Sequence, residues 1–205
     1  MKQISATILA EFILTSYPDK NITPMKLQKL AYYAKAWTLV ANRQCTDAQF
    51  ERWQFGPVNR EIYQKYKLYS RENIPIPVDM QTRVQGEDAD FLKFILNNYV
   101  DHSAVALSAM THKEKPWVET LPDAVIPDDV IREYYSKRSF ARNFQGKAWN
   151  EGKFYVLKTN SWHSFTMDMT DEEAKAYESY ASYTEYLRRT KIANQEFDKF
   201  LEKLF

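Results

Sequence analysis

Glycine is scarce in this sequence, with four residues in a chain of 205. Phosphate-binding loops depend on closely spaced glycines, because only glycine lets the backbone approach a phosphate in such turns. The composition therefore disfavours a nucleotide enzyme. The single cysteine, Cys45, excludes an intramolecular disulfide and a cysteine-only zinc site. A lone cysteine is typical of a reducing compartment, so we expect a cytoplasmic protein.

The chain also lacks a long apolar run and a strong net charge. Glu11 interrupts the apolar residues near the N-terminus before a signal-peptide core or a span of about 20 apolar residues could form. We therefore predict no membrane partner. The formal net charge of +1 gives no overall attraction to phosphate backbones, which makes DNA a disfavoured partner.

Apolar and aromatic residues are plentiful. Hydrophobic residues make up 44% of the chain and aromatic residues 15%, which predicts a folded protein with broad aromatic packing or binding surfaces. The length suffices for one domain with an appendage. None of the three histidines has metal-ligand spacing, so we expect neither a metal nor a cofactor.

Helical signals dominate residues 1–138. Thr23 and Pro24 are typical of a helix start, an N-cap followed by proline at the first helical position. Ser103 and the acidic pair at 128–129 predict two further helix starts. The aromatic run 50–55 is compatible with either a short strand or a helical turn, and Pro57 is expected to open another helix.

The pattern changes after residue 138. The β-prone runs within 153–169 flank a turn-like Thr-Asn-Ser sequence and predict a β-hairpin. Residues 171–205 lack proline and glycine and follow a Thr170/Glu173 capping box, which predicts one long helix. The predicted fold is mainly α: a compact multi-helix domain over 1–138, with a short β-hairpin and a long C-terminal helix appended over 139–205.

Three local patterns could carry chemistry or binding. His112 beside Glu114 could act as a base in a hydrolase, although a hydrogen-bonded turn or core histidine is the simpler interpretation. The lysines and tyrosines of 26–35 could bind nucleic acid, but we interpret them as the solvated edge of a helix. The basic run from Lys137 to Lys147 fits a linker as well as it fits a contact with an acidic partner.

Four blocks, in this order and spacing, resemble the Panacea antitoxin domain, a family of phage-associated, SocA-like proteins. They are Ile22–Ala34, Phe50–Val58 with Ile62–Tyr63, Leu107–His112 with Pro116–Trp117, and Ile126–Asp129 with Tyr134–Tyr135. The resemblance covers residues 1 to about 138. Arg52 and Lys113 depart from it, since a small residue and an acidic residue are expected at these positions.

The resemblance implies a mainly helical antitoxin that neutralises a toxin protein by direct binding, without catalysis. A DNA-binding autorepressor, a protease adaptor and a His112-dependent hydrolase remain alternatives, and self-association stays open. We interpret the motif residues as structural: Thr23, Pro24, Lys26, Leu27, Lys29, Tyr32, Tyr33, Trp53, Gly56, Pro57, Val58, Thr111, His112, Pro116 and Trp117.

The appended region is the predicted docking site for the toxin. Tyrosines spaced by three residues drift around a helix, so some of them must face solvent or a partner. Tyrosine is also enriched at protein interfaces. The predicted partner-binding residues are Trp162, Phe165, Tyr177, Tyr180, Tyr183 and Tyr186. Packing of this helix onto its own domain is the alternative.

Overall fold

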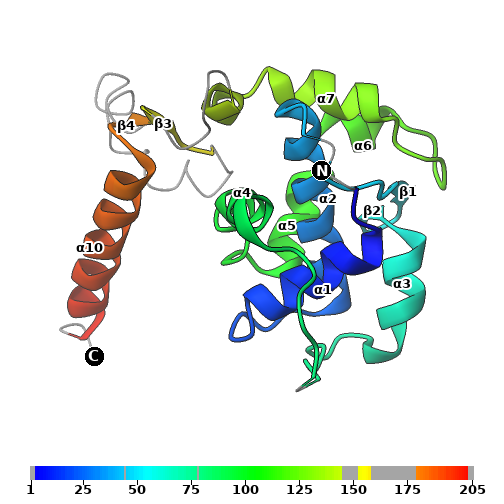
Figure 1. Ribbon diagram of the computed structural model, residues 1–205, viewed down its shortest axis with the longest axis horizontal. Coiled ribbons are helices and arrows are strands. Elements are labelled where there is room, and N and C mark those ends of the chain that lie inside the picture. The colour runs from blue at the N-terminus through cyan, green and yellow to red at the C-terminus, as the bar shows by residue number, and fades with distance from the viewer. Residues whose placement is uncertain (1–2, 44, 78, 145–151, 158–178, 203–205) are drawn as a thin grey trace. The chain divides into compact units, whose positions relative to one another are not determined.

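The computed structural model describes residues 3–43, 45–77, 79–144, 152–157 and 179–202 (Figure 1). The chain divides into two compact units, Met1–Lys137 and Arg138–Phe205. The fold is mainly α-helical, as predicted.

Helix α2 (Pro24–Val40) is the centre of the first unit. It contacts α1 (Ala6–Ser16), α4 (Gly86–Leu96), α5 (Ala104–Thr111) and α7 (Asp128–Ser136). Every residue from Lys26 to Thr38 is buried. The predicted solvated edge is therefore wrong, because a helix surrounded by others has no free edge. Its lysines keep their charged ends satisfied at the periphery of the core: Lys26 Nζ donates to the Lys20 carbonyl, and Lys35 pairs with Asp128.

Local capping chemistry sets the predicted helix starts. The Thr23 hydroxyl accepts a hydrogen bond from the Lys26 N–H, and the Ser103 hydroxyl accepts one from the Ala106 N–H. Both bonds satisfy N–H groups that have no partner within the helix. Helix α7 begins at Asp128, which places two acidic residues at the positive end of its dipole. The three predicted starts are confirmed.

An aromatic cluster fills the core between α2, α4 and α7. Tyr33 stacks on Tyr99 with ring centroids 4.0 Å apart. The Trp37 indole donates a 2.6 Å hydrogen bond to the Tyr99 hydroxyl. Tyr135 of α7 packs edge-on against both Tyr33 and Trp37. Burying such rings with their polar tips paired supplies most of the packing that holds α7 on α2.

Residues 50–58 form a β-hairpin. Strand β1 (Glu51–Trp53) pairs antiparallel with β2 (Gly56–Val58), so Gln54 and Phe55 make the turn. Pro57 lies in β2 and does not open a helix, contrary to the prediction. Helix α3 (Arg60–Tyr66) begins after Asn59, whose side-chain oxygen accepts from the Ile62 N–H. The short helices η1 (Lys67–Tyr69) and α6 (Lys115–Glu119) complete the unit.

The second unit contains η2 (Ser139–Phe144), β3 (Phe154–Tyr155), β4 (Ser179–Tyr180) and α10 (Tyr183–Glu202). Strand β3 pairs antiparallel with β4. Its partner therefore lies further along the chain than the predicted hairpin, whose second strand falls outside the described residues. Asn143 ties η2 to β3, since its side chain exchanges two hydrogen bonds with the Tyr155 backbone.

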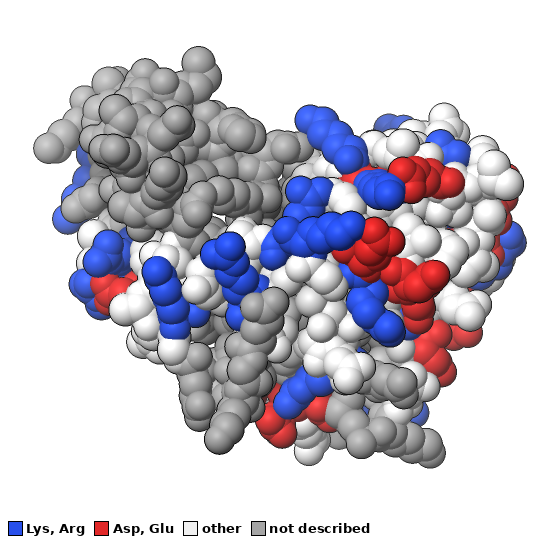
Figure 2. Space-filling view, turned by 90° about the horizontal axis from the view of Figure 1, so that it is seen from above, with Lys and Arg blue, Asp and Glu red and all other residues white. Residues whose placement is uncertain are grey.

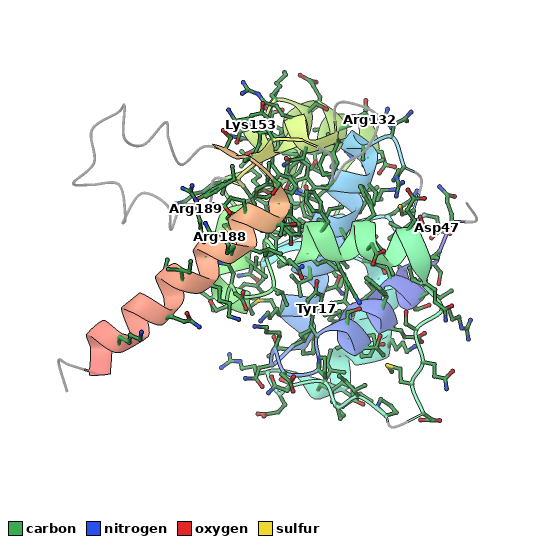
Figure 3. The ribbon with its side chains drawn as sticks, turned by 60° about the vertical axis from the view of Figure 1, so that its left-hand side comes forward. Tyr17, Asp47, Arg132, Lys153, Arg188 and Arg189 are labelled. Atoms are coloured by element: carbon green, nitrogen blue, oxygen red, sulfur yellow. The ribbon has the colours of Figure 1, made fainter. Side chains whose placement is uncertain are left out.

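Helix α10 begins at Tyr183, later than the predicted start at 171. The Ser182 hydroxyl accepts from the Glu185 N–H, so Ser182 is the N-cap of α10, a helix start that was not predicted. Glu185 also pairs with Arg188 at 2.8 Å and Arg189 at 2.7 Å (Figure 3). Hydrogen bonds from these two guanidinium groups lower the pKa of Glu185 to about 2.

Charges are mixed over the described surface. Lysine and arginine side chains lie interspersed with aspartate and glutamate on the face drawn in Figure 2. This distribution agrees with a formal net charge of +1. Among the helices of the described segments, none combines the length and the apolar character that crossing a membrane requires.

Candidate functional site

The β1–β2 hairpin is held by side chains that reach its backbone carbonyl groups from three helices. The donors are the Lys29 ammonium to Pro57 at 2.9 Å, the Ser108 hydroxyl to Phe55 at 3.0 Å, and the Trp117 indole to Trp53 at 3.1 Å. His112 Nε2 lies 2.8 Å from the Gln54 carbonyl oxygen. We call Lys29, Ser108, His112 and Trp117 the hairpin clamp. Turn carbonyls that water would otherwise bind are thereby fixed by the protein.

Gln28 extends this attachment to the end of β2. Its amide donates to the Asn59 carbonyl at 3.1 Å and accepts from the Asn59 N–H at 2.8 Å. The Asn59 side chain in turn donates to the Gln49 carbonyl. Both ends of the hairpin are thus joined to each other and to α2.

Gly56 lets the hairpin approach α2 and α5. Its φ of +99° lies in a region that other residues rarely adopt. A Cβ atom here would lie 2.6 Å from Thr111 Oγ1 and 2.7 Å from Lys29 Cε. Thr111 is itself fully buried, with its hydroxyl bonded to the Ser108 carbonyl. Gly56, Lys29 and Thr111, three motif residues far apart in sequence, therefore occupy one contact.

Burial of Lys29 perturbs its ionisation. The side chain is 1% exposed, and burial lowers its pKa from the ordinary value of 10.5 to about 7. An ammonium group is costly to bury without a counter-ion. Its described hydrogen-bond acceptor is the neutral Pro57 carbonyl, so Lys29 holds the hairpin by a hydrogen bond that the neutral amine can also donate.

His112 occupies a structural position at the end of α5. Its Nδ1 lies 2.6 Å from the Ser108 carbonyl oxygen, while Nε2 faces Gln54. Glu114, proposed as its orienting acid, instead accepts hydrogen bonds from the hydroxyl groups of Tyr33 and Tyr135. With both ring nitrogens directed at carbonyl oxygens, this geometry offers no base for a substrate.

Aromatic rings flank the hairpin on both sides. Tyr63 packs against Trp53 at 4.9 Å between ring centroids, and His112 packs against Trp117 at 4.1 Å. Arg52, which departs from the family pattern, places its guanidinium 4.4 Å from the Trp117 ring centroid. Arg52 therefore covers the outer side of a clamp residue without entering the core.

Several of the remaining motif residues are buried. Tyr32, Tyr33 and Leu27 are fully buried in α2, and Val58 is buried in β2. Pro116 starts α6, where a missing N–H costs nothing. The described parts of the motif thus face inward, and they fix the position of the hairpin turn.

The hairpin turn and the segments attached to it expose apolar side chains. Phe55, at the turn, is 63% exposed. The loop after α6 runs beside β1, with hydrogen bonds from Arg52 to Ala124 and from Asp123 back to Arg52. We define the hairpin face as the exposed apolar residues of the turn, this loop, α6 and the first turn of α5: Phe55, Val105, Val118, Leu121 and Val125.

The predicted partner-binding tyrosines lie in the second unit. Tyr183 and Tyr186 pack on the buried ring of Phe154, at 5.1 and 4.7 Å between centroids, and Tyr180 packs on Tyr186 at 5.2 Å. All three remain partly exposed. Trp162, Phe165 and Tyr177 lie outside the described residues. The structure brings the three described tyrosines together as the internal contact of their own unit.

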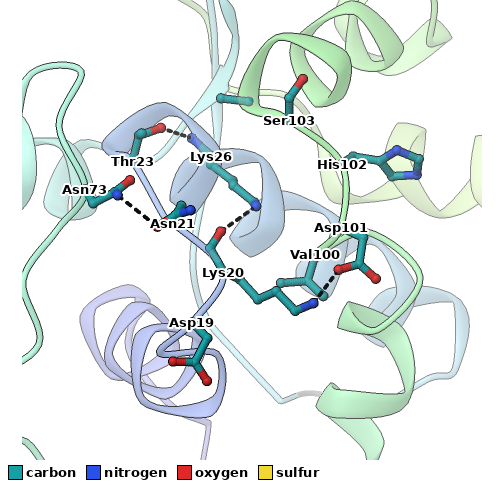
Figure 4. Close-up of a pocket in the computed structure, with 11 residues that line it drawn as sticks. Asp19, Lys20, Asn21, Thr23, Lys26, Asn73, Val100, Asp101, His102 and Ser103 are labelled. Carbon is teal, nitrogen blue, oxygen red and sulfur yellow. Dashed lines mark hydrogen bonds and ion pairs between the residues drawn. The ribbon is translucent and has the colours of Figure 1, made fainter. Parts of the chain in front are cut away.

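The depression between α2 and α5 and the basic run from Lys137 to Lys147 are weaker candidates for a binding site. A shallow depression of about 460 Å³ lies between the N-terminal ends of α2 and α5 (Figure 4). Its two lysines are already engaged: Lys20 pairs with Asp101, and Lys26 donates to the Lys20 carbonyl. In the basic run, Lys137 pairs with Glu133 and Arg142 lies over the Tyr155 ring, whereas Lys147 is outside the described residues.

Replacing Gly56 with alanine should destabilise the first unit by about 2–4 kcal/mol, since the strained φ adds to an unavoidable overlap with Thr111. Gly86 is the matched control, with φ +60° but open space around it. Gly86→Ala should cost about 1 kcal/mol from strain alone. Urea denaturation measures both, and equal losses would contradict the close approach at Gly56.

The pKa of Lys29 predicts a pH dependence of stability. Between pH 7 and 9 the unfolded chain keeps a proton on Lys29 that the folded protein has released, so the free energy of unfolding rises with pH. This contribution reaches about 1.4 kcal/mol per pH unit. Lys29→Met should remove it. In denaturation experiments, the free energy of unfolding of the wild type minus that of Lys29→Met should increase from pH 7 to 9 and stay constant below pH 6. A difference that stays constant over the whole pH range would refute the assignment.

Comparison with known proteins identifies the domain. Residues 27–118 match the family described as Antitoxin SocA-like, Panacea domain, which confirms the resemblance seen in the sequence. The match contains all but the first three residues of the central helix, the hairpin and all four clamp residues. No curated protein and no solved structure matches the chain.

Proposed function

We propose that this protein, which carries a SocA-like Panacea domain in residues 27–118, is an antitoxin that neutralises a toxin protein by binding it directly. The family supports a role of the toxin–antitoxin kind. The observation that carries the proposal is the exposed hairpin turn, whose backbone is held by the clamp residues of the same domain.

A fixed backbone favours recognition. A loop that is already ordered loses less conformational entropy when it binds, so more of the contact energy remains as affinity. The clamp meets this condition with hydrogen bonds from α2 and α6 to the two strands next to the turn and from α5 to the turn itself. Phe55 is then presented as a rigid aromatic anchor, the type of residue that often dominates the energy of a protein interface.

The hairpin face indicates the chemistry of the toxin surface. Phe55 requires an apolar pocket on the toxin, and the exposed aliphatic residues Leu121 and Val125 of the hairpin face favour further apolar contacts. The guanidinium of Arg60 lies beside Trp53, is exposed, and pairs with Glu51. Exposed charges of both signs beside the apolar residues contribute to the orientation of a bound toxin more than to its affinity.

The first test is co-expression with the product of the adjacent gene. We expect that product to arrest growth alone and growth to recover with the antitoxin present. Phe55→Ala should weaken toxin binding by about tenfold or more, without loss of stability, because the ring is exposed. Leu68→Ala is the matched control, an apolar residue that is 88% exposed on η1, away from the turn.

Two results would contradict the proposal. An adjacent gene product that is harmless alone, or that stays toxic with this protein present, would refute the antitoxin function. A Phe55→Ala protein that binds and neutralises the toxin like the wild type would exclude the hairpin face as the binding site, while the antitoxin function would still stand.

The tyrosines of the second unit are a proposed auxiliary contact. Tyr183 and Tyr186 pack on Phe154, Tyr180 packs on Tyr186, and all three residues remain partly exposed, which leaves tyrosine surface for a contact with the toxin. Tyr180→Phe, Tyr183→Phe and Tyr186→Phe together keep the ring packing and remove the hydroxyls. We expect toxin affinity to fall by about three- to tenfold. Unchanged affinity in a binding titration would exclude the hydroxyls from the interface.

A further inference from the structure

Arg52 of β1 is held in place by its backbone and by an aromatic ring. Its N–H donates to the Ala124 carbonyl at 2.9 Å, and its carbonyl accepts from the Asp123 N–H at 2.8 Å. Its guanidinium lies over the Trp117 ring, 4.4 Å from the ring centroid. The Trp117 indole is itself bonded to the Trp53 carbonyl. The position of this guanidinium is therefore set without an ion pair.

The N–H donors of the Arg52 side chain have no partner within the described part of the chain. Its Nε is buried and makes no hydrogen bond there, and no described carboxylate pairs with the group. A ring under the face of a guanidinium leaves the N–H donors free, because they lie in the guanidinium plane. A buried donor without an acceptor destabilises the free protein, and an acceptor from a partner would remove that cost.

The acidic residues next to Arg52 act on a different arginine, Arg60. Glu51 precedes Arg52 in β1 and forms its ion pair with Arg60. The bond from Glu51 and, to a smaller extent, the charge of Asp123 raise the pKa of Arg60. Arg52 consequently keeps a positive charge that no described acidic side chain compensates by an ion pair.

The segments that contact Arg52 carry exposed apolar residues of the hairpin face. Val118 follows Trp117 in α6, and Leu121 belongs to the loop whose backbone bonds to Arg52. The same segments also expose the acidic residue Glu119. An extended polyanion such as a nucleic-acid backbone requires several cations in a row, which this mixture does not offer. A single negative group with apolar neighbours fits it better.

We propose that Arg52 binds a carboxylate of the toxin, on an aspartate or glutamate that lies beside an apolar residue. The proposal rests on the antitoxin function and specifies the chemistry of its partner. The planar fork of a guanidinium matches a carboxylate through two parallel hydrogen bonds. Because Trp117 already orders the Arg52 side chain, less conformational entropy is lost on binding.

The affinity for the purified product of the adjacent gene tests the role of Arg52. Arg52→Met should weaken binding by about tenfold or more. Arg52→Lys keeps the charge but not the two parallel donors, so it should recover only part of the affinity. Arg71→Met is the matched control, because it removes an exposed positive charge outside the hairpin face, and it should bind like the wild type.

Urea denaturation distinguishes a role in binding from a role in folding. Methionine can also pack on the Trp117 ring, and it lacks the buried Nε donor that has no partner. The denaturation midpoint of Arg52→Met should therefore not fall below that of the wild type. A lower midpoint with unchanged affinity would show that Arg52 only covers Trp117, and would overturn the proposal.

Charge exchange identifies the acidic residue on the toxin. Arg52→Glu should abolish binding, and each aspartate and glutamate of the toxin is then replaced with arginine in turn. One of these toxin variants should bind Arg52→Glu more tightly than it binds the wild-type protein, since the ion pair re-forms with its signs exchanged. A complete scan in which no variant recovers binding would contradict a direct contact between Arg52 and a carboxylate.

A library of random peptides displayed on bacteria separates this proposal from the antitoxin function, because it does not require the toxin. Peptides selected on the full wild-type chain should carry an aspartate or glutamate beside an apolar residue, and should bind Arg52→Met about tenfold more weakly. Selected peptides that lack an acidic residue and bind both proteins equally would overturn the proposal.

The two failures give different results. An adjacent gene product that is harmless or does not bind, together with acidic peptides that depend on Arg52, would refute the antitoxin function and leave Arg52 as a carboxylate site. A toxin that the wild type and Arg52→Met bind and neutralise equally would leave the antitoxin function standing and refute the role of Arg52.

Discussion

The burial of Lys29 beneath the hairpin is the constraint on which the first unit depends. Its ammonium reaches the Pro57 carbonyl through a space that exists because Gly56 has no side chain. Removal of a charge from water is unfavourable, and burial accordingly lowers the pKa of Lys29 to about 7. The rest of the fold must offset this cost, and the aromatic packing around α2 contributes to doing so.

The hairpin binds its own domain on one side and is exposed on the other. Lysine, serine, histidine and tryptophan side chains bind its carbonyl groups from within, while Phe55 points outward. The clamp residues of the domain can therefore hold the hairpin in place without contacting a partner protein. Differences in specificity would then arise from exposed positions such as Phe55, Val118 and Leu121, which substitution changes without disturbing the clamp.

The second unit follows a different principle. Its described core is small, formed by Phe140, Phe154 and the tyrosines that begin α10. A unit with so little buried surface gains stability when a further face is covered.

The sequence by itself determined the helix starts at Thr23, Ser103 and Asp128, because capping and dipole effects act over a few neighbouring residues. It also predicted the domain that residues 27–118 match, from sequence blocks that lie largely within those residues. Only the tertiary structure decided that Lys26, Lys29 and Lys35 are buried, since their partners come from distant parts of the chain. The convergence of Lys29, Gly56 and Thr111, and the exposure of Phe55 beside them, likewise depended on long-range packing that no local pattern encodes.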